Sequence, residues 1–122
     1  MPYVEILAPP VAPDGKALLA KSVTQGLMSA FGIDADIITL FFLPVVPGDY
    51  AHAGEIGTKG IGQRILLKVH AFRRSVAERR AAASALTEGV CAAYGVPGSA
   101  VAVYFLDRDK DEVAHDSRLA SD

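Results

Sequence analysis

The sequence predicts an α/β fold: a tandem β-α-β repeat that forms one four-stranded mixed sheet with two helices on one face. Three observations lead to this prediction. The chain matches itself at an offset of 63 residues, which places Phe31 on Tyr94. Each half has the pattern strand, helix, strand. A β-α-β unit is a right-handed crossover, so the strands within each half are expected to be parallel.

The two halves, residues 2–58 and 63–122, agree in apolar pattern more than in identity. Phe31-Gly32-Ile33 falls on Tyr94-Gly95-Val96, and Met28 falls on Cys91. We therefore expect a single domain built from two copies of one supersecondary unit.

In the first half, residues 2–8 are predicted to form a strand, because they are rich in β-formers and the segment PPVAP follows them. Residues 14–31 have apolar side chains at helical spacing, and Gly32 follows at the position of a left-handed C-cap. Residues 37–43 are predicted to form a strand that is apolar on both faces, as in a covered sheet.

In the second half, strands are predicted over residues 64–72 and 100–105, with a helix over residues 76–94 between them. A capping box at Ser75–Glu78 marks the start of this helix, because its hydroxyl and carboxylate satisfy unpaired backbone amides. Gly95 ends it.

Composition narrows the classes of function. The apolar fraction of 51% is high for so short a chain, and one sheet face is left without helices, so we expect that face to be an oligomer contact. The net charge of -2 without a basic face argues against nucleic acid. The single cysteine, Cys91, permits no internal disulfide and indicates a cytoplasmic location. The longest apolar run is broken by Pro44 and is too short for a membrane span.

No metal or nucleotide motif is evident. The three histidines lack the spacing of metal ligands, and the segment GTKGIG lacks the ending of a phosphate-binding loop, so we expect no cofactor and no metal. His70 and Lys68 are interpreted as residues of the sheet or of an oligomer contact. Glu5 and Lys68 are repeat mates of opposite charge, and we expect them within ion-pair or water-bridged reach on the face away from the helices.

Pro2 has two interpretations. A strand tolerates proline at its first residue but does not require it, and the repeat mate Ile65 is an ordinary strand residue. If Met1 is removed, however, Pro2 carries a secondary amine, a group that no side chain supplies.

Three features together resemble the tautomerase superfamily: Pro2 at the start of the first strand, two β-α-β units in tandem, and RRSVAERR at the second strand-to-helix turn. Its members include 4-oxalocrotonate tautomerase, 5-carboxymethyl-2-hydroxymuconate isomerase, malonate semialdehyde decarboxylase, cis-3-chloroacrylic acid dehalogenase and macrophage migration inhibitory factor (MIF). The resemblance implies the tautomerase/MIF fold and a homotrimer. It also implies a processed N-terminal proline as catalytic base or acid, with arginines that hold a carboxylate substrate.

Carried over by position, the resemblance implies that Pro2 is catalytic and that Arg73 and Arg74 bind the substrate. The decarboxylase and the dehalogenase have a pair of arginines at this turn, but with a different spacing. Which of the two arginines here matches which family arginine therefore stays open.

Three further substrate-binding residues follow from the same comparison. Tyr104 resembles a pocket tyrosine of the dehalogenase, His115 falls where that enzyme has an acidic residue that activates water, and Tyr50 resembles a pocket phenylalanine of 4-oxalocrotonate tautomerase. The chain also departs from its relatives. Leu27 stands where the dehalogenase has a pocket histidine, and Thr39 or a neighbour stands where the tautomerase has a substrate-binding arginine.

The chemistry explains why a proline amine would be used. An α-amine titrates near about 7.7–8.0, and both burial and nearby cations lower its pKa towards neutral pH, where proton transfer is most effective. We therefore predict a tautomerase that uses Pro2 as general base and acid on a small carboxylate-bearing enol or 2-oxo acid. A decarboxylase, a hydratase or dehalogenase, and a non-enzymatic binding protein that keeps the fold are the alternatives.

Overall fold

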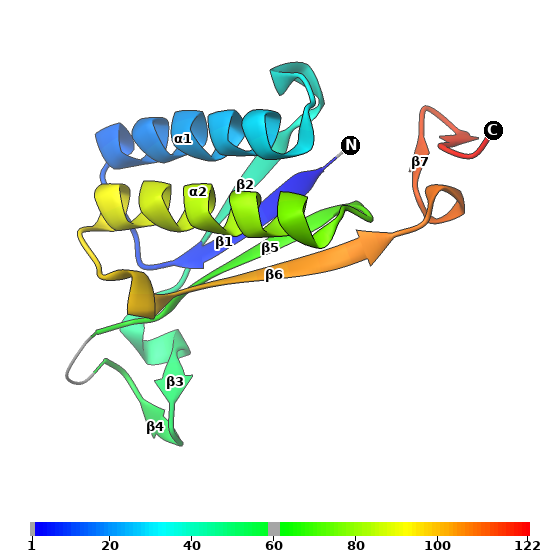
Figure 1. Cartoon of the computed structure of the whole chain (residues 1–122). Coiled ribbons are helices and arrows are strands. Elements are labelled where there is room, and N and C mark those ends of the chain that lie inside the picture. Colours follow the sequence, from blue (N-terminus) through cyan, green and yellow to red (C-terminus); the bar gives the residue numbers. More distant parts are fainter. Residues whose placement is uncertain (1, 59–61) are drawn as a thin grey trace.

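The computed structural model describes residues 2–58 and 62–122. Six long elements follow the chain in the order strand, helix, strand, twice (Figure 1): β1 (Tyr3–Ala8), α1 (Pro13–Phe31), β2 (Thr39–Pro44), β5 (Ile65–Phe72), α2 (Val76–Tyr94) and β6 (Val101–Arg108). Each half ends in a short hairpin, formed by β3 (Ala51–His52) with β4 (Glu55–Ile56), and by β7 (Ala114–His115) with β8 (Arg118–Leu119).

The four long strands form one mixed sheet in the order β2-β1-β5-β6, and α1 and α2 lie side by side over one face of it (Figure 1). Strands within each half are parallel, whereas β1 and β5 run antiparallel at the centre. This confirms the predicted fold class. Glu5 and Lys68 are directly opposite each other in the central ladder, as the repeat predicted.

The helix ends follow from local sequence. Gly32 closes α1 and Gly95 closes α2. Both residues lie in the left-handed region, with φ of 64° and 66°, as the sequence predicted. At the start of α2, the Ser75 hydroxyl accepts a hydrogen bond from the Glu78 amide at 3.1 Å, and the Glu78 carboxylate accepts one from the Ser75 amide at 3.0 Å. The predicted capping box is therefore confirmed.

Two strand boundaries differ from the predictions by more than one residue. The strand expected from residue 37 begins at Thr39, because Ala35–Ile37 form a turn of 3₁₀ helix. The strand expected to end at residue 105 continues to Arg108, because β6 stays paired with β5 as far as Phe72.

The core lies between the sheet and the two helices. Alternate residues of the central strands, including Val4, Ile6 and Leu67, are buried together with Leu19 and Leu86 of the helices. The helices themselves pack closely through small residues. A Cβ atom added at Gly89 of α2 would lie 2.8 Å from the Ser22 hydroxyl of α1, and one added at Gly26 would lie 2.9 Å from the Ala85 Cβ atom.

The opposite face of the sheet carries no helix and exposes large apolar side chains. Phe41 of β2 is 52% exposed and Tyr104 of β6 is 60% exposed, and Tyr3 and Leu43 are partly exposed on the same face. Monomeric proteins rarely leave such a surface open to water. Within the described residues, neither helix combines the length and apolar character that crossing a membrane requires.

Candidate functional site

A cavity of about 310 Å³ lies at the end of the sheet where β1 begins and where β5 and β6 end. Pro2 forms part of its wall, and its polar lining includes His70 near the end of β5, Arg108 at the end of β6 and Glu112 in the turn after β6. Apolar side chains such as Phe72 and Val113 complete it. The volume is at the lower end of the range for small-molecule sites.

Pro2 is held at this cavity by the pairing of the first strands. Its side chain is fully buried, and its carbonyl oxygen accepts a hydrogen bond from the Thr39 amide at 3.3 Å. The parallel pairing of β1 with β2 begins directly after it, with Tyr3 opposite Thr39. The backbone nitrogen at position 2 is therefore placed by the hydrogen-bonded pairing of β1 with β2.

His70 joins an arginine to a carboxylate. An Arg108 Nη2 atom lies 3.0 Å from His70 Nδ1, and His70 Nε2 lies 2.5 Å from the Glu5 Oε2 atom. A guanidinium can only donate, so Nδ1 must accept. The imidazole is therefore neutral, with its proton on Nε2, which donates to the Glu5 carboxylate.

The His70 ring is also fixed by packing. The Tyr3 ring stacks on it in parallel, with the two centroids 4.1 Å apart and an interplanar angle of 3°. Phe41 in turn contacts Tyr3 edge-on, with centroids 6.1 Å apart. His70 is only 7% exposed, so its orientation in the cavity wall is set on both its edges and one of its flat sides.

The two arginines that the resemblance implied lie at the same end of the sheet, but neither lines this cavity within one chain. Arg73 is largely exposed and forms an ion pair with Asp107 at 2.7 Å. Arg74 places its guanidinium over the Phe31 ring, 4.9 Å from the centroid. Their proposed role in substrate binding stays a prediction.

Tyr50 and Tyr104 come together, but at the other end of the sheet. Both line a second cavity of about 610 Å³, where the Tyr50 hydroxyl accepts a hydrogen bond from the Arg64 amide at 3.1 Å. His115 lies exposed in β7 and lines neither cavity, although its neighbour Ala114 borders the Pro2 cavity. Of the predicted site residues, only Pro2 is in the first cavity.

The two cavities are repeat mates. At the 63-residue offset, the second cavity has Ile65 in the place of Pro2, Leu7 in the place of His70 and Val45 in the place of Arg108. The fold therefore accepts apolar residues at all three positions. The polar set beside Pro2 is a feature of one cavity and not a requirement of the architecture.

Sequence reasoning missed Glu5, His70 and Arg108 as site residues. His70 was interpreted as part of the sheet, and Arg108 was placed beyond the end of its strand. A signal was present, because His70 and Arg108 replace apolar repeat mates, and such breaks in an otherwise apolar pattern mark candidate functional positions.

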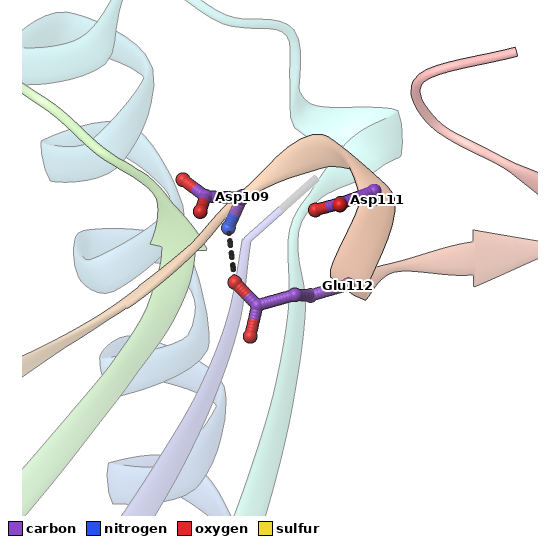
Figure 2. Close-up of side chains that lie close together, drawn as sticks. All are labelled: Asp109, Asp111 and Glu112. Atoms are coloured by element: carbon purple, nitrogen blue, oxygen red, sulfur yellow. Dashed lines mark hydrogen bonds between the residues drawn. The ribbon is translucent and has the colours of Figure 1, made fainter.

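Three acidic side chains gather in the turn after β6: Asp109, Asp111 and Glu112 (Figure 2). The Glu112 carboxylate accepts a hydrogen bond from the Asp109 amide at 2.9 Å, which closes a capping box around this short turn. All three residues are exposed, and the capping geometry accounts for the closeness of Asp109 and Glu112. The cluster therefore indicates a stable turn rather than a cation site.

The chain is similar in structure to several solved proteins, although no protein-family model and no curated protein sequence matches it. A fused 4-OT, solved as a wild-type asymmetric trimer, matches with a TM-score of 0.90 and 19% identity over 98% of this chain and 96% of that chain. A member of the cis-3-chloroacrylic acid dehalogenase family matches with a TM-score of 0.80 and 14% identity, over 96% and 82% of the two chains.

Malonate semialdehyde decarboxylase matches with a TM-score of 0.75 and 17% identity, over 92% of this chain and 88% of that chain. All three similar structures belong to the group that the N-terminal proline and the tandem repeat resembled. At these identities the similarity shows the fold, and the chain has the fold of the tautomerase superfamily.

Proposed function

We propose that this chain is an enzyme of the tautomerase superfamily that interconverts the enol and keto forms of a small carboxylate-bearing substrate. In this proposal Met1 is removed, and the amine of Pro2 takes a proton from one atom of the substrate and returns it to another. The observation that carries the proposal is the position of Pro2, a buried residue in the wall of a cavity with apolar sides and the guanidinium of Arg108, which no carboxylate of the described residues neutralises.

The cavity suits the chemistry of a secondary amine. Burial among apolar side chains and a cation in the same cavity both disfavour the protonated amine, so both lower its pKa towards neutral pH. A base with such a pKa is efficient in both directions of proton transfer. Because the ring nitrogen belongs to the backbone, the pairing of β1 with β2 fixes its direction.

The repeat argues that Pro2 is not there for the fold. Ile65 occupies the equivalent position in the second half and is itself fully buried at the start of β5. A β-branched residue suits that position of a strand better than proline, which cannot donate to the ladder. Proline at position 2 therefore has a chemical rather than an architectural explanation.

We also propose a homotrimer. The sheet face opposite the helices exposes Phe41 and Tyr104, and the similar fused 4-OT structures are described as trimers. Tyr50 and Tyr104 lie at the far end of the sheet from Pro2, so the proposal places them in the Pro2 cavity of a neighbouring chain. Arg73, Arg74 and His115 are proposed only as residues at the rim of that shared site.

The test uses Pro2→Ala and Pro2→Ile, the second of which copies the repeat mate. Intact mass should show that the wild-type chain starts at Pro2. Ketonisation of phenylenolpyruvate and of 2-hydroxymuconate should fall by roughly 10²–10⁴-fold in both variants, the range that a positioned acid–base group contributes.

The pH–rate profile of the wild-type protein should show one ionisation that both variants lose or shift. Fully active protein that retains methionine would overturn the proposal. Rates unchanged in Pro2→Ile would do the same.

A further inference from the structure

We propose that Arg108, oriented by His70 and Glu5, binds the carboxylate of a small monocarboxylate in the Pro2 cavity. The proposal rests on the proposed function, because it names the group that holds the substrate beside Pro2. Arg108 is the binding residue, and His70 and Glu5 are positioning residues.

Arg108 has a charge that no carboxylate neutralises in the described residues. Its guanidinium donates to His70 Nδ1 at 3.0 Å and to the Asp107 carbonyl oxygen at 3.1 Å, and both acceptors are neutral. A guanidinium has five N–H groups, so donors remain for a ligand. Since Arg108 is half-buried and lines the cavity, its charge favours an anion there.

The two other arginines at this end of the sheet do not line the cavity. Arg73 is paired with the Asp107 carboxylate and is largely exposed, and Arg74 lies over the Phe31 ring with its buried Nε atom unpaired in the described residues. A pair with an exposed carboxylate weakens the attraction for a second anion. Arg108 is therefore the cation that the described geometry leaves available to the cavity.

His70 orients Arg108 without neutralising it. If Glu5 contacted the guanidinium directly, a bidentate ion pair would use the donors that a substrate needs. Here the neutral imidazole lies between the two charges, with Nε2 anchored on Glu5 and Nδ1 accepting from Arg108. The stacked Tyr3 ring keeps the imidazole in that plane.

The repeat provides an internal comparison. The mates of Glu5, His70 and Arg108 are Lys68, Leu7 and Val45, which cannot form this network. The equivalent cavity at the other end of the sheet therefore forms without this network. Of the two repeat-related cavities, the one that contains Pro2 has this network and the other does not, among the residues that the structure describes.

The remaining lining selects for one carboxylate. Phe72, Ala71 and Val113 offer apolar contacts to the rest of a ligand. Glu112 borders the same cavity, and its negative charge disfavours a second carboxylate on the ligand. The cavity therefore fits a compact acid with an apolar remainder better than a diacid.

The binding test separates this proposal from catalysis by using Pro2→Ala as the background. Phenylpyruvate and its ethyl ester are titrated calorimetrically into this protein and into versions that also carry Arg108→Val or His70→Leu. Both added changes copy the repeat mates, so the sheet is expected to accept them. Arg80→Ala, an exposed arginine of α2, serves as the matched control.

We expect Arg108→Val to weaken phenylpyruvate binding by roughly 10–100-fold while the ester is bound as before, because hydrogen bonds to charged groups are the strong ones. His70→Leu should reduce the preference for the acid over the ester by a smaller factor, about 3–10-fold. His70→Asn, which keeps an acceptor near the Nδ1 position, should restore part of that preference. A purely structural His70 would change the binding of acid and ester alike.

Equal losses for acid and ester in Arg108→Val would overturn the proposal, as would loss of acid preference in Arg73→Ala or Arg74→Ala but not in Arg108→Val. The two proposals fail separately. If Pro2→Ala keeps wild-type turnover while Arg108→Val still loses acid binding, the proposed function is wrong and the Arg108 site stands.

Discussion

Glu5 accepts its hydrogen bond from His70 at 2.5 Å, although the register places Lys68 directly opposite it across β1 and β5. The repeat correctly placed Glu5 and Lys68 opposite each other, but Glu5 accepts its direct hydrogen bond from His70, the next residue after Lys68 on the same face of β5. The His70–Glu5 hydrogen bond links the centre of the sheet to the cavity at the end of the sheet. A residue of the pseudo-symmetric sheet centre thereby becomes part of the candidate site.

Glu5→Ala should lower the free energy of unfolding by about 1–3 kcal/mol, because it leaves the buried Nε2–H group of His70 without an acceptor. Lys68→Ala is the matched control from the opposite strand. Its ammonium makes no direct ion pair in the described structure, so the loss should stay within about 0–1 kcal/mol. Urea unfolding measures both, and equal losses would mean that the His70–Glu5 bond adds no stability.

Much of the fold follows from local sequence patterns. The left-handed glycines Gly32 and Gly95 and the box at Ser75–Glu78 set the helix ends, because each depends on a few neighbouring residues. The alternation of apolar residues is equally local. The four-stranded sheet then follows from the repeat, since two right-handed units leave few arrangements.

The candidate site was less predictable, because it depends on long-range pairing. Arg108 reaches His70 only because β6 continues in register with β5, which places Phe72 opposite Arg108 and His70 opposite Leu106. The apolar run ends at Leu106, and the charged residues Asp107 and Arg108 gave no reason to continue the strand. The contact between His70 and Arg108 could therefore not be predicted before the register of β5 and β6 was known.

Ser75→Ala should destabilise the chain by about 0.5–2 kcal/mol, as loss of an N-cap does. Two hydrogen bonds from Ser75, chiefly that of its backbone amide, hold the pKa of Glu78 below its ordinary value of 4.5. Because the pKa of Glu78 is lower in the folded state, the stabilisation from these hydrogen bonds is full above pH 4.5. It is lost as the pH falls through the pKa of Glu78 in the folded protein.

Urea unfolding of both proteins across pH 3 to 7 measures the effect. The stability gap between wild type and Ser75→Ala should narrow on acidification. Because Ser75→Ala keeps the backbone amide that binds Glu78, a gap that stays constant over this range would show that the Ser75 hydroxyl does not contribute to the lowered pKa of Glu78.

Glu112→Gln should relax the preference for monocarboxylates. Removing the negative charge from the cavity border should raise the affinity for 2-oxoglutarate by about 3–10-fold relative to phenylpyruvate, which corresponds to the loss of one partly screened repulsion. Glutamine keeps an oxygen for the Asp109 amide, so the turn should persist. Asp111→Asn, in the same turn but outside the cavity lining, is the control and should leave the ratio unchanged.

Phe41→Asp should convert the trimer into a monomer, because a charge within the exposed apolar face disfavours the burial of that face. Leu18→Asp is matched to it, since Leu18 is about as exposed but lies on α1, away from that face. Light scattering at micromolar concentration should give three chains for wild type and for Leu18→Asp. A wild-type monomer would contradict the proposed assembly.

Mixing two inactive variants tests whether neighbouring chains share a site. In one chain Tyr104 and Pro2 line cavities at opposite ends of the sheet, so Tyr104 can reach Pro2 only from another subunit. Pro2→Ala removes the proposed base, and the double variant Tyr50→Ala with Tyr104→Ala removes the proposed far wall. Unfolded together in equal amounts and refolded, the two chains should form mixed trimers.

In a mixed trimer, a site is intact where Pro2 comes from the double variant and the tyrosines come from the Pro2→Ala chain. In random assembly, half of the sites have Pro2 from the double variant, and half of these have a Pro2→Ala chain as the neighbour that supplies the tyrosines. About a quarter of the sites should therefore be restored, and about a quarter of wild-type activity should return. Mixing without unfolding is the control and should restore nothing. If refolded mixtures also stay inactive while light scattering shows trimers, each site lies within a single chain, and Tyr50 and Tyr104 belong to the second cavity alone.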